Sequence, residues 1–481
     1  MKLNWFSPLP PAKTDIAHYT ARILPALRAH AEVTLWTDQK DWDESLNLNA
    51  KVRRYRRLER MPWAELNRAD MSIYNIGNNP IFHGSIWEVS QRHPGVVVLH
   101  DYSLQEFFYS LYLGRWEDLA AYLTQMEFYY GERGRREAEA CFRNKGEMLS
   151  ELAERYPLTK LALENALGVL VHTREALDKL KRDGHCPLTY APLPFAATCD
   201  ARGGDPPNPD SRAEGPPYRL IVFGYLARNR RLEELLKALA EFGEREQFHL
   251  DVYGQVSNEK KLRQSIRLLQ LEKHVTVYGF VPEAELERAL STAHLAINLR
   301  YPTAGEASGS QLRLWSHALP SLVTKVGWYA TLPEDAVCLV RATHEIEDIL
   351  RHLKAFLSDP SQFAAMGRKG FALYQQQHLP EHYTAAVLSL VSVAQAFRPI
   401  PIAQKLILKT KLEMGRWLQP MLLNECLDRI AAEKAQLLYG RSVSSSSRQS
   451  LTKRVKKFIR RRLPRRVYAY YVAQRDRLRG Y

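Results

Sequence analysis

The sequence contains few cysteines and no long apolar run. Its five cysteines are widely scattered and form no Cys-x-x-Cys pair, which argues against a disulfide framework or a zinc knuckle and favours a reducing compartment. The most apolar stretch, 385–397, is interrupted by polar residues and is shorter than the roughly 20 residues that span a bilayer. Prolines follow the first residues too closely for a signal-peptide core, so we expect a cytoplasmic protein.

Basic residues are in excess only at one end of the chain. The net charge is +15, but residues 441–481 hold fourteen of the 68 lysines and arginines and only one of the 53 acidic residues. The preceding 440 residues are therefore nearly neutral, and their charge is no argument for nucleic-acid binding. With 45% hydrophobic and 25% charged residues, the composition is that of a globular protein, and the length of 481 residues predicts two substantial domains.

Two series of short apolar runs predict an α/β fold. Val- and Ile-rich runs alternate with amphipathic stretches, which is typical of a parallel sheet covered by helices. The first series predicts strands at 3–6, 33–36, 71–75, 96–99, 168–171 and 188–191. The second series predicts strands at 219–223, 250–253, 275–278, 295–299 and 321–324. We expect two doubly wound Rossmann-like domains that face each other across a cleft, with a helical, basic C-terminal extension.

Composition also predicts the domain boundaries. The first domain is expected at 1–199, with a helical insertion at about 104–163 whose many aromatic residues either pack in a core or line a binding surface. Prolines and glycines at 200–217 predict a linker. The remaining boundaries are 218–376 for the second domain, 377–399 for a helix that returns to the first domain, and 400–481 for the extension.

Ligands of open α/β sheets bind at the carboxyl ends of the strands, so the residues that follow each strand are candidates. His100 and Asp101 follow a strand of the first series. His100 would donate a hydrogen bond to an incoming hydroxyl or carry a proton, and the alternative is a structural pair with Asp101. Arg228, Arg230 and Arg231 follow the first strand of the second series and precede a helix. They form either an anion site suited to a diphosphate or a solvated basic turn.

The loop after the strand that ends near Leu299 carries the most informative pattern. Ser308 and Gln311 have capping-box spacing, so a helix is expected to begin near Ser308. Gly305 allows a close approach of the backbone, and the first helical turn offers free N–H groups to phosphate or sugar oxygens. Glu306 would either accept hydrogen bonds from sugar hydroxyls or complement the helix dipole.

Several strings occur in a familiar order and spacing. They are FSPLPP and IAHY near the N-terminus, HPGVVVLHDY at 93–102, ALGVLVHT at 166–173, FGYLARNRR at 223–231 and LRYPTAGEASGS at 299–310, followed by ALPSLVT and GWYATLP. Together they resemble the signatures of a GT-B fold retaining glycosyltransferase of family four (glycosyl transferases group 1). The resemblance covers about residues 1–397.

The resemblance implies an acceptor-side first domain, a nucleotide-sugar-binding second domain, and a role for each candidate residue. The implied catalytic residues are Glu306, His100 and Arg230. The implied acceptor-side residues are Asp15, Ile16, His100 and Asp101. The implied donor-binding residues are Gly224, Tyr225, Arg230, Arg231, Arg300, Gly305, Glu306, Ala307, Ser308, Gly309 and Ser310.

The resemblance also implies the reaction. A sugar would move, with retention, from a GDP- or UDP-sugar to a glycan or lipid-linked acceptor, in cell-surface polysaccharide or glycolipid synthesis. No cofactor is expected, and preorganised cations and N–H groups would stabilise the leaving diphosphate without a metal.

Some positions depart from the family pattern. Leu314 stands where a second glutamate would hold the ribose, Tyr225 replaces a loop arginine, and Thr14 and Asp15 replace small residues. The substitution at Leu314 leaves two readings open. The chain is either an active enzyme with altered ribose contacts or a catalytically inactive sugar-nucleotide-binding subunit.

Two strings with metal-binding spacing are interpreted as chance. Asp41 and Asp43 form an Asp-x-Asp pair, but it follows an early strand, away from the donor loops. His378 and His382 fit a zinc-protease pattern that requires both histidines on one helix. Pro380 stands between them and would break such a helix, so no metal site is predicted.

The basic C-terminal segment suggests a membrane surface as a partner. Residues 451–466 have apolar positions near helical spacing among many basic ones, which predicts a helix that binds anionic lipid at the inner face of the membrane. A solvated basic tail is the alternative. Nucleic-acid binding by the tail is less favoured, because few aromatic residues stand among the basic ones.

Overall fold

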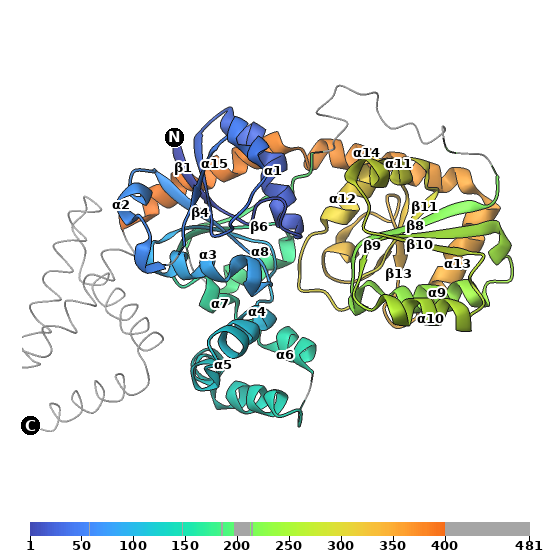
Figure 1. Cartoon of the computed structure of the whole chain (residues 1–481), viewed down its shortest axis with the longest axis horizontal. Helices are drawn as coiled ribbons and strands as arrows, with labels where there is room; N and C mark the ends of the chain where they lie inside the picture. Colours follow the sequence, from blue (N-terminus) through green and yellow to red (C-terminus); the bar gives the residue numbers. More distant parts are fainter. Residues whose placement is uncertain (57, 147, 184–185, 197–211, 213–214, 400–481) are drawn as a thin grey trace, which may run out of the picture. The chain divides into compact units, whose positions relative to one another are not determined.

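The computed structural model describes residues 1–399 except 57, 147, 184–185, 197–211 and 213–214 (Figure 1). Most of the expected linker and the whole extension, including the proposed membrane helix at 451–466, lie outside the described residues. Residues up to Gln395 form one compact unit.

The first domain contains a seven-stranded parallel sheet with the order β3-β2-β1-β4-β5-β6-β7. The inner strands are apolar and buried, and every strand expected in this half of the chain is present. Its strands are β1 (Lys2–Phe6), β2 (Glu32–Thr37), β3 (Lys51–Arg54), β4 (Met71–Ile76), β5 (Gly95–Leu99), β6 (Ala166–Val171) and β7 (Leu188–Tyr190). The sequence pattern did not predict β3, because its residues KVRR form an exposed edge strand without an apolar run.

The second domain contains a six-stranded parallel sheet with the order β10-β9-β8-β11-β12-β13. Its strands are β8 (Tyr218–Leu226), β9 (Phe248–Val256), β10 (Val275–Gly279), β11 (Leu295–Asn298), β12 (Ser321–Thr324) and β13 (Cys338–Val340). The short edge strand β13 was not predicted. In both domains the chain order reverses beside the first strand, which is the Rossmann arrangement that the alternating pattern predicts. The expected fold class is therefore confirmed.

Helices cover both faces of the first sheet, because its strands are apolar on both sides. One core includes Phe6, Tyr74 and Val97 and packs against α3 (Pro80–Arg92), α4 (Gln105–Ser110) and α8 (Arg174–Asp183). The other includes Trp5 and Val98 and packs against α1 (Asp15–Arg28) and α15 (Pro380–Phe397). The helices of this half are α1 (Asp15–Arg28), α2 (Trp63–Leu66), α3 (Pro80–Arg92), α4 (Gln105–Ser110), α5 (Leu119–Phe142, kinked at Gly131), α6 (Leu149–Arg155), α7 (Thr159–Ala162) and α8 (Arg174–Asp183).

The helices of the second half include the return to the first domain. They are α9 (Leu232–Glu241), α10 (Glu259–Leu268), α11 (Glu283–Thr292), α12 (Gly309–Ser316), α13 (Glu345–Ser358), α14 (Pro360–Gln377) and α15 (Pro380–Phe397). The last of these, orange in Figure 1, packs Tyr383, Val387 and Leu390 into the core that contains Trp5. The two sheets are thus connected by this helix as well as by the segment around 200–217.

The insertion in the first domain uses most of its aromatic residues for packing. Phe107, Phe108 and Tyr122 are fully buried, and Tyr112 is nearly so. This confirms the packing interpretation for these residues. Trp116 is an exception, since 38% of its surface is exposed.

Tight backbone packing brings the ends of β8 and β9 together. Gly224 and Gly254 are paired in the sheet, and both have positive φ angles, of 106° and 108°. A Cβ atom on Gly254 would lie 2.1 Å from the carbonyl oxygen of Gly224. Only glycine fits at Gly254, and this contact determines how β8 enters the arginine-containing turn.

Among the described residues, no helix has both the length and the hydropathy to cross a bilayer.

Candidate active site

Loops from both domains meet at the carboxyl ends of β5 and β11. The backbone N–H groups of Tyr102 and Ser103 donate hydrogen bonds to the carbonyl oxygen of Ala304, at 3.1 and 3.0 Å. Asp101 and Glu306 lie close enough for their charges to interact. The structure thus brings together the two loops that the sequence analysis selected in separate domains.

Glu306 is held by its own loop. Its Oε1 accepts a hydrogen bond from Arg300 Nη1 at 2.5 Å, and its Oε2 accepts from Thr303 Oγ1 at 2.6 Å and from the Ala304 N–H at 2.8 Å. Burial alone would raise the pKa of this carboxyl, but Arg300 and Thr303 outweigh it and lower the pKa below its usual value. Glu306 is therefore a fixed, largely buried anion, with 13% of its side chain exposed, rather than a side chain that caps α12.

Asp101 is the second carboxyl of the site. Its Oδ2 accepts a hydrogen bond from the Asn78 N–H at 2.7 Å. Burial and the nearby charge of Glu306 raise the pKa of Asp101 to about 7, although Asn78 and Arg300 oppose this. The folded structure therefore favours one ionised carboxylate of Asp101 and Glu306 over two.

The raised pKa of Asp101 predicts a pH-dependent stability. The folded chain holds this proton more tightly than the unfolded chain, so stability falls as pH rises from about 4 to about 7. Asp101→Asn removes the titrating group and keeps an acceptor for Asn78. We expect the melting temperature of the variant to rise relative to the original chain between about pH 5 and pH 8, as measured by thermal unfolding.

Asp43→Asn is the matched control for this comparison. Asp43 is exposed, and its pKa is lowered by hydrogen bonds with Ser45, so it should stay ionised throughout that pH range in both folded and unfolded states. If the melting temperatures of Asp101→Asn and of the original chain changed with pH in the same way, the interpretation would be contradicted.

Arg230 is a buried cation with unused hydrogen-bond donors. It ends a 3₁₀ turn, Arg228–Arg230, and only 5% of its surface is exposed. Its Nη2 donates to Asn298 Oδ1 at 2.9 Å, while among the described residues its Nε and Nη1 have no partner. Burial and the neighbouring Arg300 lower the pKa of Arg230 to about 10, so it stays charged near neutral pH.

The strand ends beside Arg230 form a polar network. Asn298 Nδ2 donates to Gln311 Oε1 at 2.9 Å, and Gln311 Nε2 donates to Ser321 Oγ at 2.8 Å. Arg300 also keeps a buried Nε without a partner in the described part of the chain. Two guanidinium groups with unfilled donors therefore flank the point where β8 and β11 diverge, which is where doubly wound sheets bind ligands.

Helix α12 begins where the capping pattern predicts. Ser308 is the N-cap and its Oγ accepts a hydrogen bond from the Gln311 N–H at 3.1 Å. The reciprocal half of the capping box is absent, because the Gln311 side chain bonds to Asn298 and Ser321 instead. The N–H groups of Gly309 and Ser310 belong to the first helical turn, which has no intrahelical acceptors.

His100 does not pair with Asp101. Its Nε2 lies 3.0 Å from Asn75 Oδ1, and Asn75 Nδ2 donates to the carbonyl oxygen of Phe6 at 2.9 Å. With the amide so oriented, Nε2 of His100 carries the proton and Nδ1 is an acceptor. Burial, together with His172 and His83, lowers the pKa of His100 well below its usual value, so the structure favours a neutral imidazole over a proton carrier.

Two other predicted residues, Arg231 and Asp15, differ in whether their charge reaches the site. Arg231 forms an ion pair with Glu345 at 2.6 Å and with Glu234 at 3.0 Å, so its charge is used within its own domain. Asp15 opens α1 in the first domain, and its charge acts on Arg230 and on Arg300.

The remaining candidates contribute mainly backbone or small surfaces. Tyr225 is 40% exposed, and burial together with the charge of Asp15 raises its pKa. Ile16 packs near Gly77, and Ala307 packs partly buried against the core around Leu312. Gly224 lies in β8, and Gly305 has a φ of 82°, with its Cα facing Tyr102.

Position 314 belongs to the core rather than to the binding surface. Leu314 is fully buried in a cluster with Ile221, Phe223 and Leu319. The residues that sequence reasoning missed are Asn75, Asn78, Asn298 and Thr303. Asn75 and Asn298 stand at or next to the last residue of a predicted apolar strand, and that position was the available signal.

The metal-like strings have structural roles. Asp43 caps a 3₁₀ turn by accepting a hydrogen bond from the Ser45 N–H at 2.9 Å. The helix break at Pro380 is confirmed, since α14 ends at Gln377 and α15 begins at Pro380. In the described part of the chain, no group of His, Cys, Asp and Glu side chains is arranged to hold a metal ion.

Two Rossmann-like domains with a charged site at joined strand ends define a GT-B fold, and similar solved structures support this class. Sucrose-phosphate synthase from Thermosynechococcus elongatus aligns with a TM-score of 0.55 at 17% identity, over 84% of this chain and 100% of that one. HepE from Anabaena, in complex with UDP and glucose, gives 0.52 at 15% identity, over 81% and 99%. WaaG, a glycosyltransferase involved in lipopolysaccharide biosynthesis, gives 0.51 at 15% identity, over 80% and 98%.

A sequence comparison gives the same answer for the second domain. Residues 208–372 match the family described as glycosyl transferases group 1. No curated protein matches the chain by sequence. The resemblance to GT-B glycosyltransferases is therefore confirmed, and the family match supports a glycosyltransferase.

Proposed function

We propose that this chain is a retaining glycosyltransferase that moves a sugar from a nucleotide-diphosphate sugar to a glycan or lipid-linked acceptor. The second domain, 218–376, binds the donor, and the first domain, 1–199, binds the acceptor. The observation that carries the proposal is a pair of guanidinium groups where β8 and β11 diverge, Arg230, which is buried, and Arg300, which is partly buried. Both keep N–H donors that have no partner among the described residues. Buried charges without full pairing are costly, and an anionic ligand would supply what they lack.

The arrangement suits the departure of a diphosphate. Negative charge develops on the leaving group, and fixed positive groups aimed at it are usually the largest catalytic term. Arg230, Arg300 and the first turn of α12 from Gly309 onwards supply that charge without a metal. Because the leaving phosphate and the acceptor share one face of the sugar, the phosphate assists in removing the acceptor proton.

The carboxylates and His100 act on the sugars. Glu306 is held in position by Arg300 and Thr303 and accepts hydrogen bonds from donor-sugar hydroxyls with its remaining lone pairs. His100 is neutral with its proton on Nε2, so its Nδ1 accepts a hydrogen bond from a sugar hydroxyl. Asp15, Ile16 and Asp101 complete the acceptor side.

The donor is a GDP- or UDP-sugar. HepE has been solved with UDP and with UDP-glucose, which favours UDP. The fold shared with WaaG favours an acceptor in cell-surface polysaccharide or glycolipid synthesis. The basic segment at 451–466 would hold the enzyme at the inner face of the membrane, where a lipid-linked acceptor is accessible.

The second candidate function is an inactive sugar-nucleotide-binding subunit, and it is favoured by Leu314. Since its side chain lies wholly in the core, it offers no contact to a ribose. Binding without turnover is the property that separates this candidate from the first.

Thermal unfolding with UDP, GDP, UDP-glucose and GDP-mannose tests the proposal. We expect at least one nucleotide to raise the melting temperature, because a ligand present at about 100 times its Kd adds about 2.7 kcal/mol of stability. The matching nucleotide sugar should also be hydrolysed slowly, with the anomeric configuration retained. Stabilisation without hydrolysis or transfer would favour the inactive subunit, and no stabilisation by any nucleotide would contradict both candidates.

A further inference from the structure

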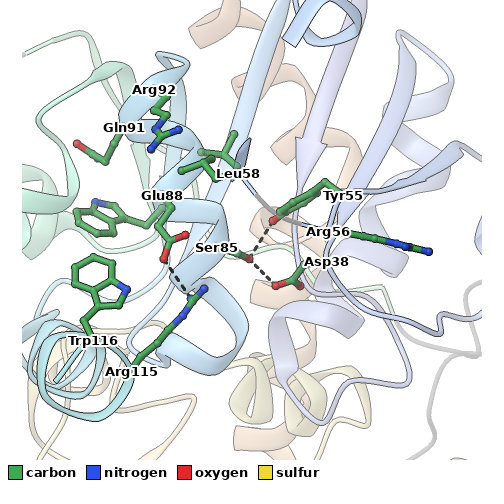
Figure 2. A pocket seen from close by; sticks show the side chains of 12 residues that line it. Asp38, Tyr55, Arg56, Leu58, Ser85, Glu88, Gln91, Arg92, Arg115 and Trp116 are labelled. Carbon is green, nitrogen blue, oxygen red and sulfur yellow. Dashed lines mark hydrogen bonds and ion pairs between the residues drawn. The ribbon is translucent and has the colours of Figure 1, made fainter. Parts of the chain in front are cut away.

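A pocket of about 520 Å³ opens on the first domain, at a place that the donor and acceptor loops do not occupy (Figure 2). It lies beyond the carboxyl ends of β2 and β3, against helix α3 and the end of the π-helical turn Leu111–Arg115. Its volume is within the range of small-molecule sites. The site described above involves the ends of β5, β8 and β11, so this pocket is a separate feature of the same domain.

One end of the pocket is aromatic. Trp87 and Trp116 both line it, with ring centres 6.0 Å apart, and Tyr112 supports Trp116 edge-on at 4.9 Å. Trp116 is 38% exposed, unlike most aromatic residues of the insertion. An indole face left open in a pocket offers an apolar platform beside polar groups.

The other end is polar and held in place by hydrogen bonds. Ser85 donates to Asp38 Oδ2 at 2.7 Å and lies 3.1 Å from the hydroxyl of Tyr55. Between the two ends, Arg115 forms an ion pair with Glu88 at 3.3 Å, as Figure 2 shows. The pocket therefore has hydroxyl, carboxylate and guanidinium groups opposite an aromatic surface.

A buried donor in the pocket lacks an acceptor. Trp87 is only 6% exposed, and in the described part of the chain its Nε1–H has no hydrogen-bond partner. A buried donor left unpaired costs roughly 1–3 kcal/mol. The N–H itself has almost no accessible surface, so a ligand hydroxyl would bond to it only after a shift of the neighbouring side chains.

Helix α3 connects the pocket to the candidate active site. The helix begins at Pro80, two residues after Asn78, whose N–H donates to Asp101 and whose side chain donates to Glu106 at 3.1 Å. Ser85 lies about 8 Å further along the helix, at about 1.5 Å per residue. The pocket residues Asp38, Tyr55 and Arg56 follow β2 and β3 at the carboxyl edge of the sheet, where the candidate site also lies, so an acceptor glycan that fills both would extend along this edge.

We propose that this pocket binds a saccharide unit of the acceptor glycan, away from the reacting sugar. A pyranose ring has an apolar face of C–H groups and a rim of hydroxyls. The face would stack on Trp116, and the rim would bond to Asp38 and Glu88. That the glycan is the acceptor rests on the transferase function proposed above, whereas carbohydrate binding by the pocket does not.

The test applies the full chain to an array of immobilised oligosaccharides that includes neutral, uronic-acid and phosphorylated repeats. We expect binding of at least one glycan in the absence of nucleotide. Trp116→Ala should weaken that binding about tenfold. Asp38→Asn should weaken it as well. This second variant changes an exposed side chain, and its amide oxygen can still accept the hydrogen bond from Ser85.

Two controls identify the site of binding. Phe128→Ala removes an aromatic residue of similar exposure outside the pocket and should bind the glycan as the original chain does. Phe142→Ala, which removes another exposed aromatic residue outside the pocket, should also leave glycan binding unchanged. Binding of no glycan, equal binding by Trp116→Ala and Asp38→Asn, or displacement of the glycan by UDP would each overturn the proposal.

The acceptor assignment has its own readout. With a bound glycan as acceptor, Trp116→Ala should raise KM for the glycan and leave kcat unchanged, because the pocket does not touch the reacting atoms. If the glycan binds but no nucleotide does, the transferase function fails and the carbohydrate site stands. Unchanged KM in Trp116→Ala would refute the assignment of the glycan as acceptor.

Discussion

Replacing Arg230 by methionine is expected to lower kcat/KM for sugar transfer by about 10²- to 10³-fold, the usual effect of removing one preorganised donor from a developing anion. The guanidinium is buried, charged and only partly paired, so most of its hydrogen-bonding capacity is left for a ligand. Affinity for the nucleoside diphosphate should fall as well, since the charge faces the diphosphate in the ground state too. Isothermal titration with UDP or GDP and initial-rate kinetics measure both effects.

Arg231→Met is the matched control, because Arg231 stands next to Arg230 but its charge is already paired within the protein. Its charge is paired with Glu345 and Glu234, and the Glu345 side chain is 4% exposed. We expect this variant to lose about 1–3 kcal/mol of unfolding free energy, because a buried carboxylate loses its partner, while nucleotide affinity stays the same. If both variants lost nucleotide affinity equally, the special role of Arg230 would be refuted.

Glu306→Gln is expected to reduce sugar transfer by about 10²-fold or more while the nucleoside diphosphate still binds. The carboxylate accepts three hydrogen bonds within its loop, and an amide cannot accept from Arg300 on one side and from Thr303 and Ala304 on the other. The lost charge is largely buried and pairs with Arg300, so the variant should also unfold at a lower temperature. The affinities for UDP and for UDP-glucose, measured separately, distinguish an effect on diphosphate binding from an effect on sugar binding.

Thr303→Val distinguishes contact with the sugar from support of the loop. It removes one hydrogen bond to Glu306 but leaves the carboxylate and its ion pair with Arg300. If Glu306 only braced the loop, Thr303→Val would reproduce a substantial part of the loss in transfer. We expect it to retain most of the activity.

Most of the fold follows from patterns that short stretches of sequence carry. Buried parallel strands need apolar residues on both sides, and runs such as Val96 to Leu99 are recognisable for that reason. The edge strand β3, with one partly buried valine among basic residues, has no such pattern, and β13 is only three residues long. Their pairing depends on neighbours that are distant in the chain.

The positions of the candidate site residues at strand ends were predictable, but the hydrogen-bond and ion-pair partners of their side chains were less so. Glu306, Asp101 and Arg230 follow or stand close to strand ends, and the rule for doubly wound sheets selects them. Arg231 is adjacent to Arg230 and looked equivalent in the sequence. In the structure it forms an ion pair with Glu345, which is more than one hundred residues away in the chain. Likewise, the tautomer of His100 is set by Asn75, which in turn is oriented by Phe6.

By itself, the sequence determined the two-sheet architecture, the start of α12 at Ser308, the helix break at Pro380 and the near-neutral charge of the body, because propensity, periodicity and capping act over a few residues. Only the tertiary structure decided which arginine keeps free donors, that Asp101 and Glu306 share one environment, and that a pocket with two tryptophans opens beside α3. Those properties depend on burial and on contacts between residues that are far apart in the chain, and a charge or an indole ring acquires its role only when the packing around it is complete.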